Sequence, residues 1–232
     1  MSGAGLGGIL FDKDGTLFDF RATWDGWGGA TLRDLAAGDA GLEARLAAAI
    51  RFDLAAGGFR DDSPVIAGTN AEVAALLAAE LTGRDPVRLE RDLVRAAEAA
   101  PLVPAAPLAP LLDTLRGAGL RLGVMTNDSQ SVAEAHLRRA GVRDRFDFVA
   151  GADSGHGAKP DPGPLLAFAR AMGLKPRQVA MVGDSTHDLR AAQAAGMVPL
   201  GVLTGPALHA DLAPLARAVL PDIGHLPDWL GL

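Results

Sequence analysis

The sequence predicts an α/β protein with a Rossmann-like, doubly wound parallel sheet and an all-helical segment inserted after the first strand. Two observations support this fold class. Short apolar runs alternate with helical segments through most of the 232-residue chain, an order typical of parallel sheets with helices on both faces. Residues 18–104 interrupt this order with helical periodicity alone. We therefore expect a core of residues 1–17 and 105–232 and a cap of residues 18–104.

Six runs are expected to form the strands of the core. They are short, rich in Val, Ile, Leu or Met, and lack strict alternation with polar residues, as strands buried on both faces do. The expected strands are Gly8–Phe11, Leu120–Met125, Phe146–Ala150, Gln178–Val182, Val198–Leu203 and Ala218–Leu220.

Helix signals separate these strands. Ser131 and Glu134 have the spacing of a capping box, which predicts a helix from there to about residue 140. Glycines follow this helix and two others and would end them in a left-handed conformation. The three expected helices are 131–140, 164–172 and 186–195.

The inserted segment shows no convincing strand and reads as four helices. Thr69 and Glu72 have the spacing of a second capping box. Trp24 and Trp27 fall in the first helix, where we expect them to pack in its apolar core. Two connections, near residues 18–21 and 99–104, would join this segment to the sheet, so we expect it to move as a lid.

Composition excludes several classes of protein. The chain has no cysteine, which excludes disulfides, thiolate metal sites and cysteine nucleophiles and fits a cytoplasmic location. Its net charge of −6 argues against a nucleic-acid partner bound by a basic surface. No apolar run approaches the roughly 20 residues of a membrane span, so no membrane partner is expected. The sequence does not indicate the oligomeric state.

Two acids directly follow the first expected strand. Asp12 and Asp14 are separated by one residue, and Gly15 then signals a turn. The carboxyl edge of an open parallel sheet is where ligands bind. Two carboxylates this close repel each other unless a cation lies between them or one is protonated. A strand that ends in a solvated Asp-Gly turn is the alternative interpretation.

Polar residues follow three more expected strands or lie beside them. Thr126 and Asn127 follow the second strand, Lys159 lies in a Gly-rich loop after the third, and Asp184 ends the fourth. The carboxyl ends of parallel strands meet at one edge, so these residues should gather near Asp12. Asp188 lies four residues beyond Asp184.

This ordered set resembles the haloacid dehalogenase-like superfamily, and within it the phosphatases with a helical cap, phosphoglycolate phosphatases in particular. The resemblance covers nearly the whole chain. It is carried by four motifs in the order of that family, with the cap inserted after the first. These motifs are Asp12-Lys13-Asp14-Gly15-Thr16, Thr126, Lys159 and Gly183-Asp184-Ser185-Thr186-His187-Asp188.

The resemblance implies a role for each motif residue. Asp12 would be the nucleophile that forms an aspartyl-phosphate, and Asp14 would be the general acid and then the base that activates water. Thr126, the amide of Asn127 and Lys159 would bind the phosphoryl group. The implied cofactor is Mg²⁺, which prefers hard oxygen ligands. The metal-site residues would be Asp12, Asp14 through its carbonyl, Asp184, and Asp188 through a water molecule.

Less specific roles remain open for some of these residues. Asp188 could be only the first-turn acid of a helix capped by Ser185. Lys159 could be a solvated loop residue, and Thr126 with Asn127 a turn and cap. Lys13 occupies a slot that is commonly apolar in the family, and strand alternation would point it away from both acids. We expect Lys13 at the back face or edge of the sheet.

The predicted function is hydrolysis of a small soluble phosphomonoester, with phosphoglycolate as the leading substrate. The cap contains no lysine and no histidine, which argues against relatives that cleave phosphonates or isomerise sugar phosphates. Arg21 could meet a substrate carboxylate, although an exposed salt bridge is the expected role. A phosphotransferase of the same fold and a non-catalytic binding protein that retains the fold are the alternatives.

Overall fold

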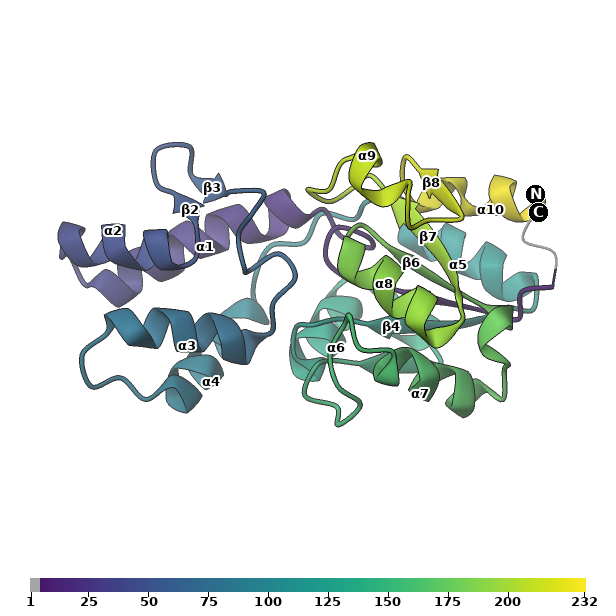
Figure 1. Ribbon diagram of the computed structural model, residues 1–232, viewed down its shortest axis with the longest axis horizontal. Helices are drawn as coiled ribbons and strands as arrows, with labels where there is room; N and C mark the ends of the chain where they lie inside the picture. The colour runs from purple at the N-terminus through teal and green to yellow at the C-terminus, as the bar shows by residue number, and fades with distance from the viewer. Residues whose placement is uncertain (1–4) are drawn as a thin grey trace.

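The computed structural model describes residues 5–232, which form two lobes (Figure 1). One lobe contains a sheet with helices on both faces, and the other contains helices α1–α4. The predicted core begins at residue 1, and its first four residues lie outside the described part of the chain. No helix formed by residues 5–232 is both long enough and apolar enough to cross a bilayer.

The sheet has six strands in the order β5-β4-β1-β6-β7-β8, and every neighbouring pair is parallel. The predicted α/β class is thereby confirmed. Each of the six predicted strands is present, with ends shifted by at most two residues. The strands are β1 (Gly8–Phe11), β4 (Arg121–Met125), β5 (Phe148–Ala150), β6 (Val179–Gly183), β7 (Val198–Val202) and β8 (Ala218–Leu220).

Three strands start one or two residues later than predicted. Gln178 lies in a 3₁₀ turn, Pro176–Gln178, so β6 starts only at Val179. Phe146 follows another 3₁₀ turn, Arg143–Arg145, and its backbone is extended, but pairing of β5 with β4 begins only at Phe148. Pairing of β4 with β1 likewise begins at Arg121 and not at Leu120.

Alternate residues of the strands pack against different helix layers. Ile9 and Phe11 of β1 belong to one buried apolar cluster, and Leu10 belongs to another on the opposite face. The first cluster includes residues of α5 (Leu108–Gly117), α6 (Gln130–Arg139) and α10 (Leu226–Leu230). The second includes residues of α7 (Gly163–Met172) and α8 (Thr186–Ala195). The short helix α9 (His209–Leu212) follows β7.

The capping box predicted at Ser131 is wrong. Helix α6 begins directly after Ser129, whose backbone is extended and whose hydroxyl accepts a hydrogen bond from the amide of Val132 at 3.4 Å. Glu134, the predicted partner in the box, instead binds Arg143 at 2.7 Å. The observed cap is Ser129, two residues before Ser131. Both residues are serines, which favour the cap position, so the sequence alone did not distinguish them.

The inserted lobe contains the four predicted helices and a hairpin that was not predicted. The helices are α1 (Phe20–Ala36), α2 (Ala40–Ala49), α3 (Asn70–Glu80) and α4 (Pro86–Ala97), and the capping box of Thr69 and Glu72 is present at α3. The hairpin pairs β2 (Phe52–Asp53) with β3 (Gly58–Phe59). Strands of two residues are too short to show the period that identifies a strand in sequence.

This lobe has an apolar core separate from the two clusters that cover the sheet. Leu32, Leu46, Leu77 and Leu89 lie in it, one from each helix. The two chain crossings lie side by side, because Phe18 pairs with Pro104 in a single β-bridge. The assignment of residues 18–104 as a cap stays a prediction, and the separate core agrees with it.

Candidate active site

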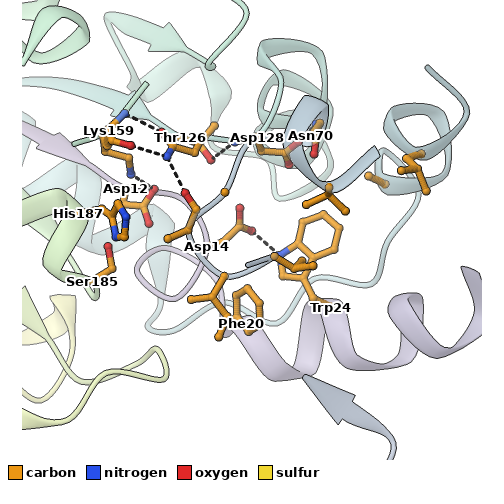
Figure 2. A pocket seen from close by; sticks show the side chains of 18 of the residues that line it. Asp12, Asp14, Phe20, Trp24, Asn70, Thr126, Asp128, Lys159, Ser185 and His187 are labelled. Carbon is orange, nitrogen blue, oxygen red and sulfur yellow. Dashed lines mark hydrogen bonds and ion pairs between the residues drawn. The ribbon is translucent and has the colours of Figure 1, made fainter. Parts of the chain in front are cut away.

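The predicted site residues come from four segments that meet at the carboxyl edge of the sheet. Asp12 directly follows β1, Thr126 follows β4, and Asp184 follows β6. Lys159 enters from the loop between β5 and α7. A pocket between the two lobes is lined by Asp12, Thr126 and Lys159 from the core and by residues of the cap (Figure 2).

Lys159 links two buried acids at the base of this pocket. Its ammonium group donates to Asp12 Oδ1 and to Asp188 Oδ1, each at 2.6 Å. Burial alone would lower the pKa of Lys159, but Asp12 and then Asp188 outweigh it and raise that pKa above its ordinary value. The lysine therefore carries its charge, and the interpretation of Lys159 as a solvated loop residue does not hold because the side chain is buried.

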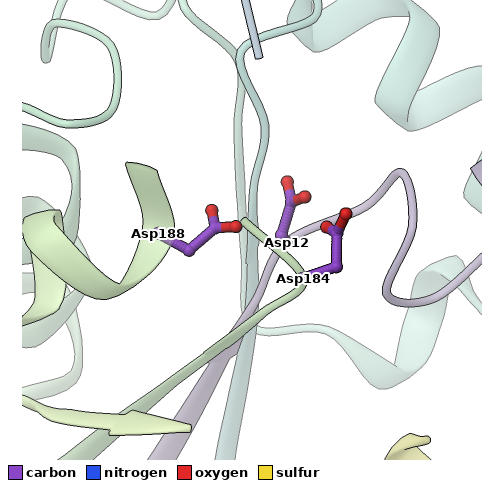
Figure 3. A group of neighbouring side chains, drawn as sticks. All are labelled: Asp12, Asp184 and Asp188. Atoms are coloured by element: carbon purple, nitrogen blue, oxygen red, sulfur yellow. The ribbon is translucent and has the colours of Figure 1, made fainter. Parts of the chain in front are cut away.

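Asp184 completes a cluster of three buried carboxylates (Figure 3). One oxygen from each of Asp12, Asp184 and Asp188 lies within 4.8 Å of the other two. Burial raises the pKa of Asp184 well above its ordinary value, and repulsion from Asp12 and Asp188 raises it further. Three carboxylates face one ammonium, so the cluster carries an excess of negative charge when all of its groups are ionised.

Glycines allow the backbone to surround these acids closely. A Cβ on Gly205 would lie 1.7 Å from Asp184 Oδ2, and one on Gly15 would lie 2.4 Å from the same atom. A Cβ on Gly183 would lie 2.3 Å from Cγ of Asp188. Any side chain at these positions would displace the carboxylates.

Burial also governs the protonation of Asp12. It raises the pKa of this carboxyl from 3.8 to about 7, against the lowering effect of Lys159 and with added repulsion from Asp188 and Asp14. A divalent cation among the three carboxylates would lower these pKa values and hold the acids ionised. The donor set consists of hard oxygens, and it suits Mg²⁺.

Asp188 caps helix α8, as one interpretation of its sequence position expected, and it also contacts Lys159. Its Oδ2 accepts from the amide and hydroxyl of Ser185, at 3.0 and 2.6 Å, and so forms the capping box at the start of α8. Its Oδ1 faces Lys159. The helix cap thus fixes one carboxylate oxygen and leaves the other to the acidic cluster.

Asn127 fixes the backbone at Lys159. Its side-chain oxygen accepts from the Lys159 amide at 2.9 Å, and its nitrogen donates to the Lys159 carbonyl at 2.8 Å. The same nitrogen donates to the carbonyl of Ala67 in the cap at 2.7 Å. Thr126 Oγ1 accepts from the amide of Asp128 at 3.1 Å, which orients its hydroxyl at the edge of the sheet. The contact of Thr126 lies within a turn, as the alternative interpretation expected, whereas the contacts of Asn127 with Lys159 and Ala67 are not those of a turn or cap.

Asp14 lies apart from the three clustered carboxylates and faces the cap. Its Oδ1 accepts from Trp24 Nε1 at 2.8 Å (Figure 2). Its Oδ2 lies 3.0 Å from Lys13 Nζ. Its side chain lines the pocket and is partly exposed. A carboxyl held in this way between the two lobes can exchange a proton with a molecule in the pocket.

The expectation that Lys13 lies at the back face or edge of the sheet is wrong. Strand β1 ends at Phe11, and the chain turns at Gly15, so strand alternation does not extend to residue 13. Lys13 is fully buried and donates to Asp128 Oδ2 at 2.8 Å. Burial alone would lower the pKa of Lys13, but Asp128 and then Asp14 raise it above its ordinary value.

Other members of this buried network were missed by sequence reasoning. His136 Nδ1 lies 3.2 Å from Lys13 Nζ, and His136 Nε2 lies 2.8 Å from the carbonyl of Ala97. Because an ammonium group only donates, Nδ1 accepts and Nε2 carries the proton. Burial, and next the charge of Lys13, lower the pKa of His136. Asn70 of the cap donates to Asp128 at 2.7 Å. The position of Asp128 directly after the Thr126-Asn127 motif was the one sequence feature that could have pointed to this network.

The tryptophans do more than fill the core of the cap. Trp24 is buried among apolar residues, as expected, but it also lines the pocket and binds Asp14. Trp27 lines the pocket as well, and the two rings pack edge to face with centroids 5.2 Å apart. Arg21 makes the expected exposed salt bridge, to Asp61 at 2.6 Å.

Two further histidines lie in different places. His187 lines the pocket on the core side, beside Ser185 (Figure 2). His156 stacks on Phe148, with ring centroids 6.3 Å apart.

Comparison with known proteins identifies the class. A model of the haloacid dehalogenase-like hydrolase family matches residues 6–196, and the chain belongs to this family. A phosphoglycolate phosphatase from Rhodospirillum rubrum is 42% identical over 122 residues, which are 52% of this chain and 50% of the relative. One from Neisseria meningitidis is 37% identical over 119 residues, 51% of this chain and 48% of the relative. The chain thus spans about half the length of these curated relatives.

The similarity to one solved structure extends over nearly the whole chain. The crystal structure of a putative haloacid dehalogenase-like hydrolase from Bacteroides fragilis has a TM-score of 0.70 and 24% sequence identity. The match covers 95% of this chain and 99% of that one. At this identity the likeness concerns the fold.

Proposed function

We propose that this protein is a magnesium-dependent phosphatase that hydrolyses a small phosphomonoester through an aspartyl-phosphate on Asp12. The observation that carries the proposal is the meeting of three buried carboxylates and Lys159, of which Asp12 and Lys159 line a pocket between the core and the cap. The family and the names of the curated relatives support the same reaction class.

The reaction would proceed in two steps that use Asp12 and Asp14. An oxygen of Asp12 attacks phosphorus as the bond from phosphorus to the leaving oxygen breaks, and Asp14 gives its proton to that oxygen. The alcohol leaves, and Asp14, now a carboxylate, takes a proton from the water that attacks the aspartyl-phosphate. Phosphate is released, and Asp12 is regenerated. The contacts of Asp14 with Trp24 and Lys13 hold it at the pocket throughout.

Binding of the phosphoryl group falls to Lys159, the hydroxyl of Thr126 and the amide of Asn127. The Lys159 ammonium offsets the repulsion between the acids and a dianionic substrate. The side chain of Asn127 keeps this lysine in place through both of its backbone contacts.

We propose that Asp12, Asp184 and the carbonyl of Asp14 hold Mg²⁺, with Asp188 acting through a water molecule. The acidic cluster and the glycines around it fit such an ion. Mg²⁺ would supply charge neutralisation for the carboxylates and the phosphoryl oxygens.

Magnesium is expected to stabilise the folded protein. At a hundredfold excess over its Kd, Mg²⁺ should raise Tm by about 5–10 °C, because only the folded chain gathers the carboxylates. Differential scanning fluorimetry with and without EDTA measures this shift. In Asp184→Asn the shift should disappear, whereas the matched control Asp34→Asn, at an exposed acid of α1, should keep it. Equal shifts in both variants would contradict the assignment of the site.

Gly205→Ala tests the close packing around Asp184. The added Cβ would collide with Oδ2 of Asp184, so kcat/KM for p-nitrophenyl phosphate should fall on the order of 10²-fold. Steady-state kinetics at saturating Mg²⁺ checks this result. Gly117→Ala is the control, since its Cβ would meet nothing within 4 Å and activity should not change. Unchanged activity in Gly205→Ala would show that Asp184 tolerates displacement.

The direct test of the function is release of phosphate from p-nitrophenyl phosphate in Mg²⁺ and in EDTA. Release that depends on Mg²⁺ supports a phosphatase. No release from this ester or from a panel of metabolite phosphates would favour the non-catalytic binding protein. A phosphorylated alcohol formed when an acceptor is added would favour the phosphotransferase.

Phosphoglycolate is supported as a substrate by the names of the curated relatives. The apolar side chains of the pocket, however, favour a leaving group without the carboxylate of phosphoglycolate. The cytoplasmic location expected from the sequence stays a prediction.

A further inference from the structure

The pocket has an apolar cap side opposite its charged base. Figure 2 shows Phe20 and Trp24 on this side, away from Asp12 and Lys159. The apolar residues that form the cap side include Phe20, Trp24, Trp27, Val65, Ile66 and Leu93. A phosphoryl group bound at Asp12 would direct its leaving group toward these side chains.

The cap offers no cation to the pocket. Residues 18–104 contain nine arginines and no lysine, and within residues 5–232 none of those arginines lines the pocket. Arg21, the one nearest in sequence to the first motif, is exposed and bound to Asp61 and to the carbonyl of Phe59. Lys159 is the single lysine or arginine of the described chain that lines the pocket, and it is bound to Asp12 and Asp188.

Two acidic side chains lie at the boundary between the base and the apolar side. Asp14 and Asp128 both line the pocket there. The ammonium group that pairs with them belongs to Lys13, which is fully buried behind them and does not line the pocket. A carboxylate on the leaving group would therefore meet two acids and lose its hydration without gaining an ion pair to a lysine or arginine of the cap.

We propose that the site takes phosphomonoesters of uncharged, largely apolar alcohols, aromatic ones included, and discriminates against leaving groups that carry a carboxylate. This inference rests on the phosphatase function proposed above and deepens it by naming the class of leaving group. Apolar contact with the rings replaces the salt bridge that phosphoglycolate would require.

A matched pair of esters tests the inference. Benzyl phosphate and its 4-carboxy derivative have similar leaving oxygens and differ mainly in the charge at the far end. We expect kcat/KM for benzyl phosphate to exceed that for the carboxy derivative and for phosphoglycolate by about tenfold or more. Equal values, or a preference for the carboxylates, would overturn the inference while leaving the phosphatase function intact.

A positive charge placed on the apolar side should reduce the preference for the uncharged ester. Ile66→Arg is expected to raise the ratio of kcat/KM for 4-carboxybenzyl phosphate to that for benzyl phosphate by about tenfold, whereas Ile66→Met, similar in length and uncharged, should not. Far-ultraviolet circular dichroism and the thermal melt report whether the variants fold, and Val65→Arg serves if Ile66→Arg does not. An unchanged ratio in a folded arginine variant would overturn the inference. If the wild-type protein hydrolyses neither p-nitrophenyl phosphate nor the other esters, the proposed function itself fails.

Discussion

Replacing Asp12 with asparagine is expected to lower kcat for p-nitrophenyl phosphate by about 10⁴-fold or more. An amide is nearly isosteric with the carboxylate but is a poor nucleophile toward phosphorus, so the aspartyl-phosphate cannot form. Steady-state phosphate release in saturating Mg²⁺ measures the loss. A variant that turns over the ester at a rate comparable to wild type would contradict the role of Asp12.

The same variant also reports on the burial of Asp12 in the absence of metal. Burial raises the pKa of this group from 3.8 to about 7 against the pull of Lys159, so between these values the folded protein binds a proton that the unfolded chain has released. The contribution of Asp12 to the unfolding free energy of the metal-free protein therefore falls as pH rises through this window. Asp12→Asn lacks this titration, so in EDTA its stability relative to wild type should increase from about pH 4 to about pH 7. Denaturant melts at several pH values measure this difference.

Replacing Lys13 with methionine is expected to destabilise the protein by about 3–5 kcal/mol. The substitution keeps most of the apolar stem but leaves the buried Asp128 and the partly exposed Asp14 without their cation. It also removes a charge that lies 5.1 Å from the centroid of the Trp24 ring. Urea denaturation with linear extrapolation measures the change.

Two controls make the result for Lys13 specific. Lys175→Met, at an exposed lysine, should change stability by no more than about 0.5 kcal/mol. Adding Asp128→Asn to Lys13→Met removes one of the unpaired charges and should recover part of the loss. If Lys13→Met were as stable as Lys175→Met, the buried network would have little energetic role.

Residues next to the ends of strands could be predicted from the sequence. Asp12, Thr126 and Asp184 each follow an apolar run, and parallel strands bring such positions to one edge of the sheet. The order of strands and helices was equally readable, because both are marked by local periodicity, glycines and caps. The site residues that local patterns indicated are those that the structure brings together, whereas their chemical roles stay proposals.

The buried network around Lys13 could not be predicted in this way. Its partners Asp128 and His136 lie 115 and 123 positions further along the chain, and no local pattern links them to Lys13. The extrapolation of strand alternation past Phe11 failed because the chain had already left the sheet. Trp24 was likewise assigned to the core of the cap, since its contact with Asp14 depends on how the two lobes meet.

Trapping the phosphorylated enzyme tests most directly whether Asp12 attacks phosphorus. The wild-type protein is mixed with substrate and Mg²⁺, quenched rapidly and reduced with borohydride, which converts an aspartyl-phosphate to homoserine. Peptide mass spectrometry then locates the modified residue. The account predicts homoserine at position 12 in wild type and none in Asp12→Asn. Turnover with homoserine at another aspartate, or with none at all, would contradict it.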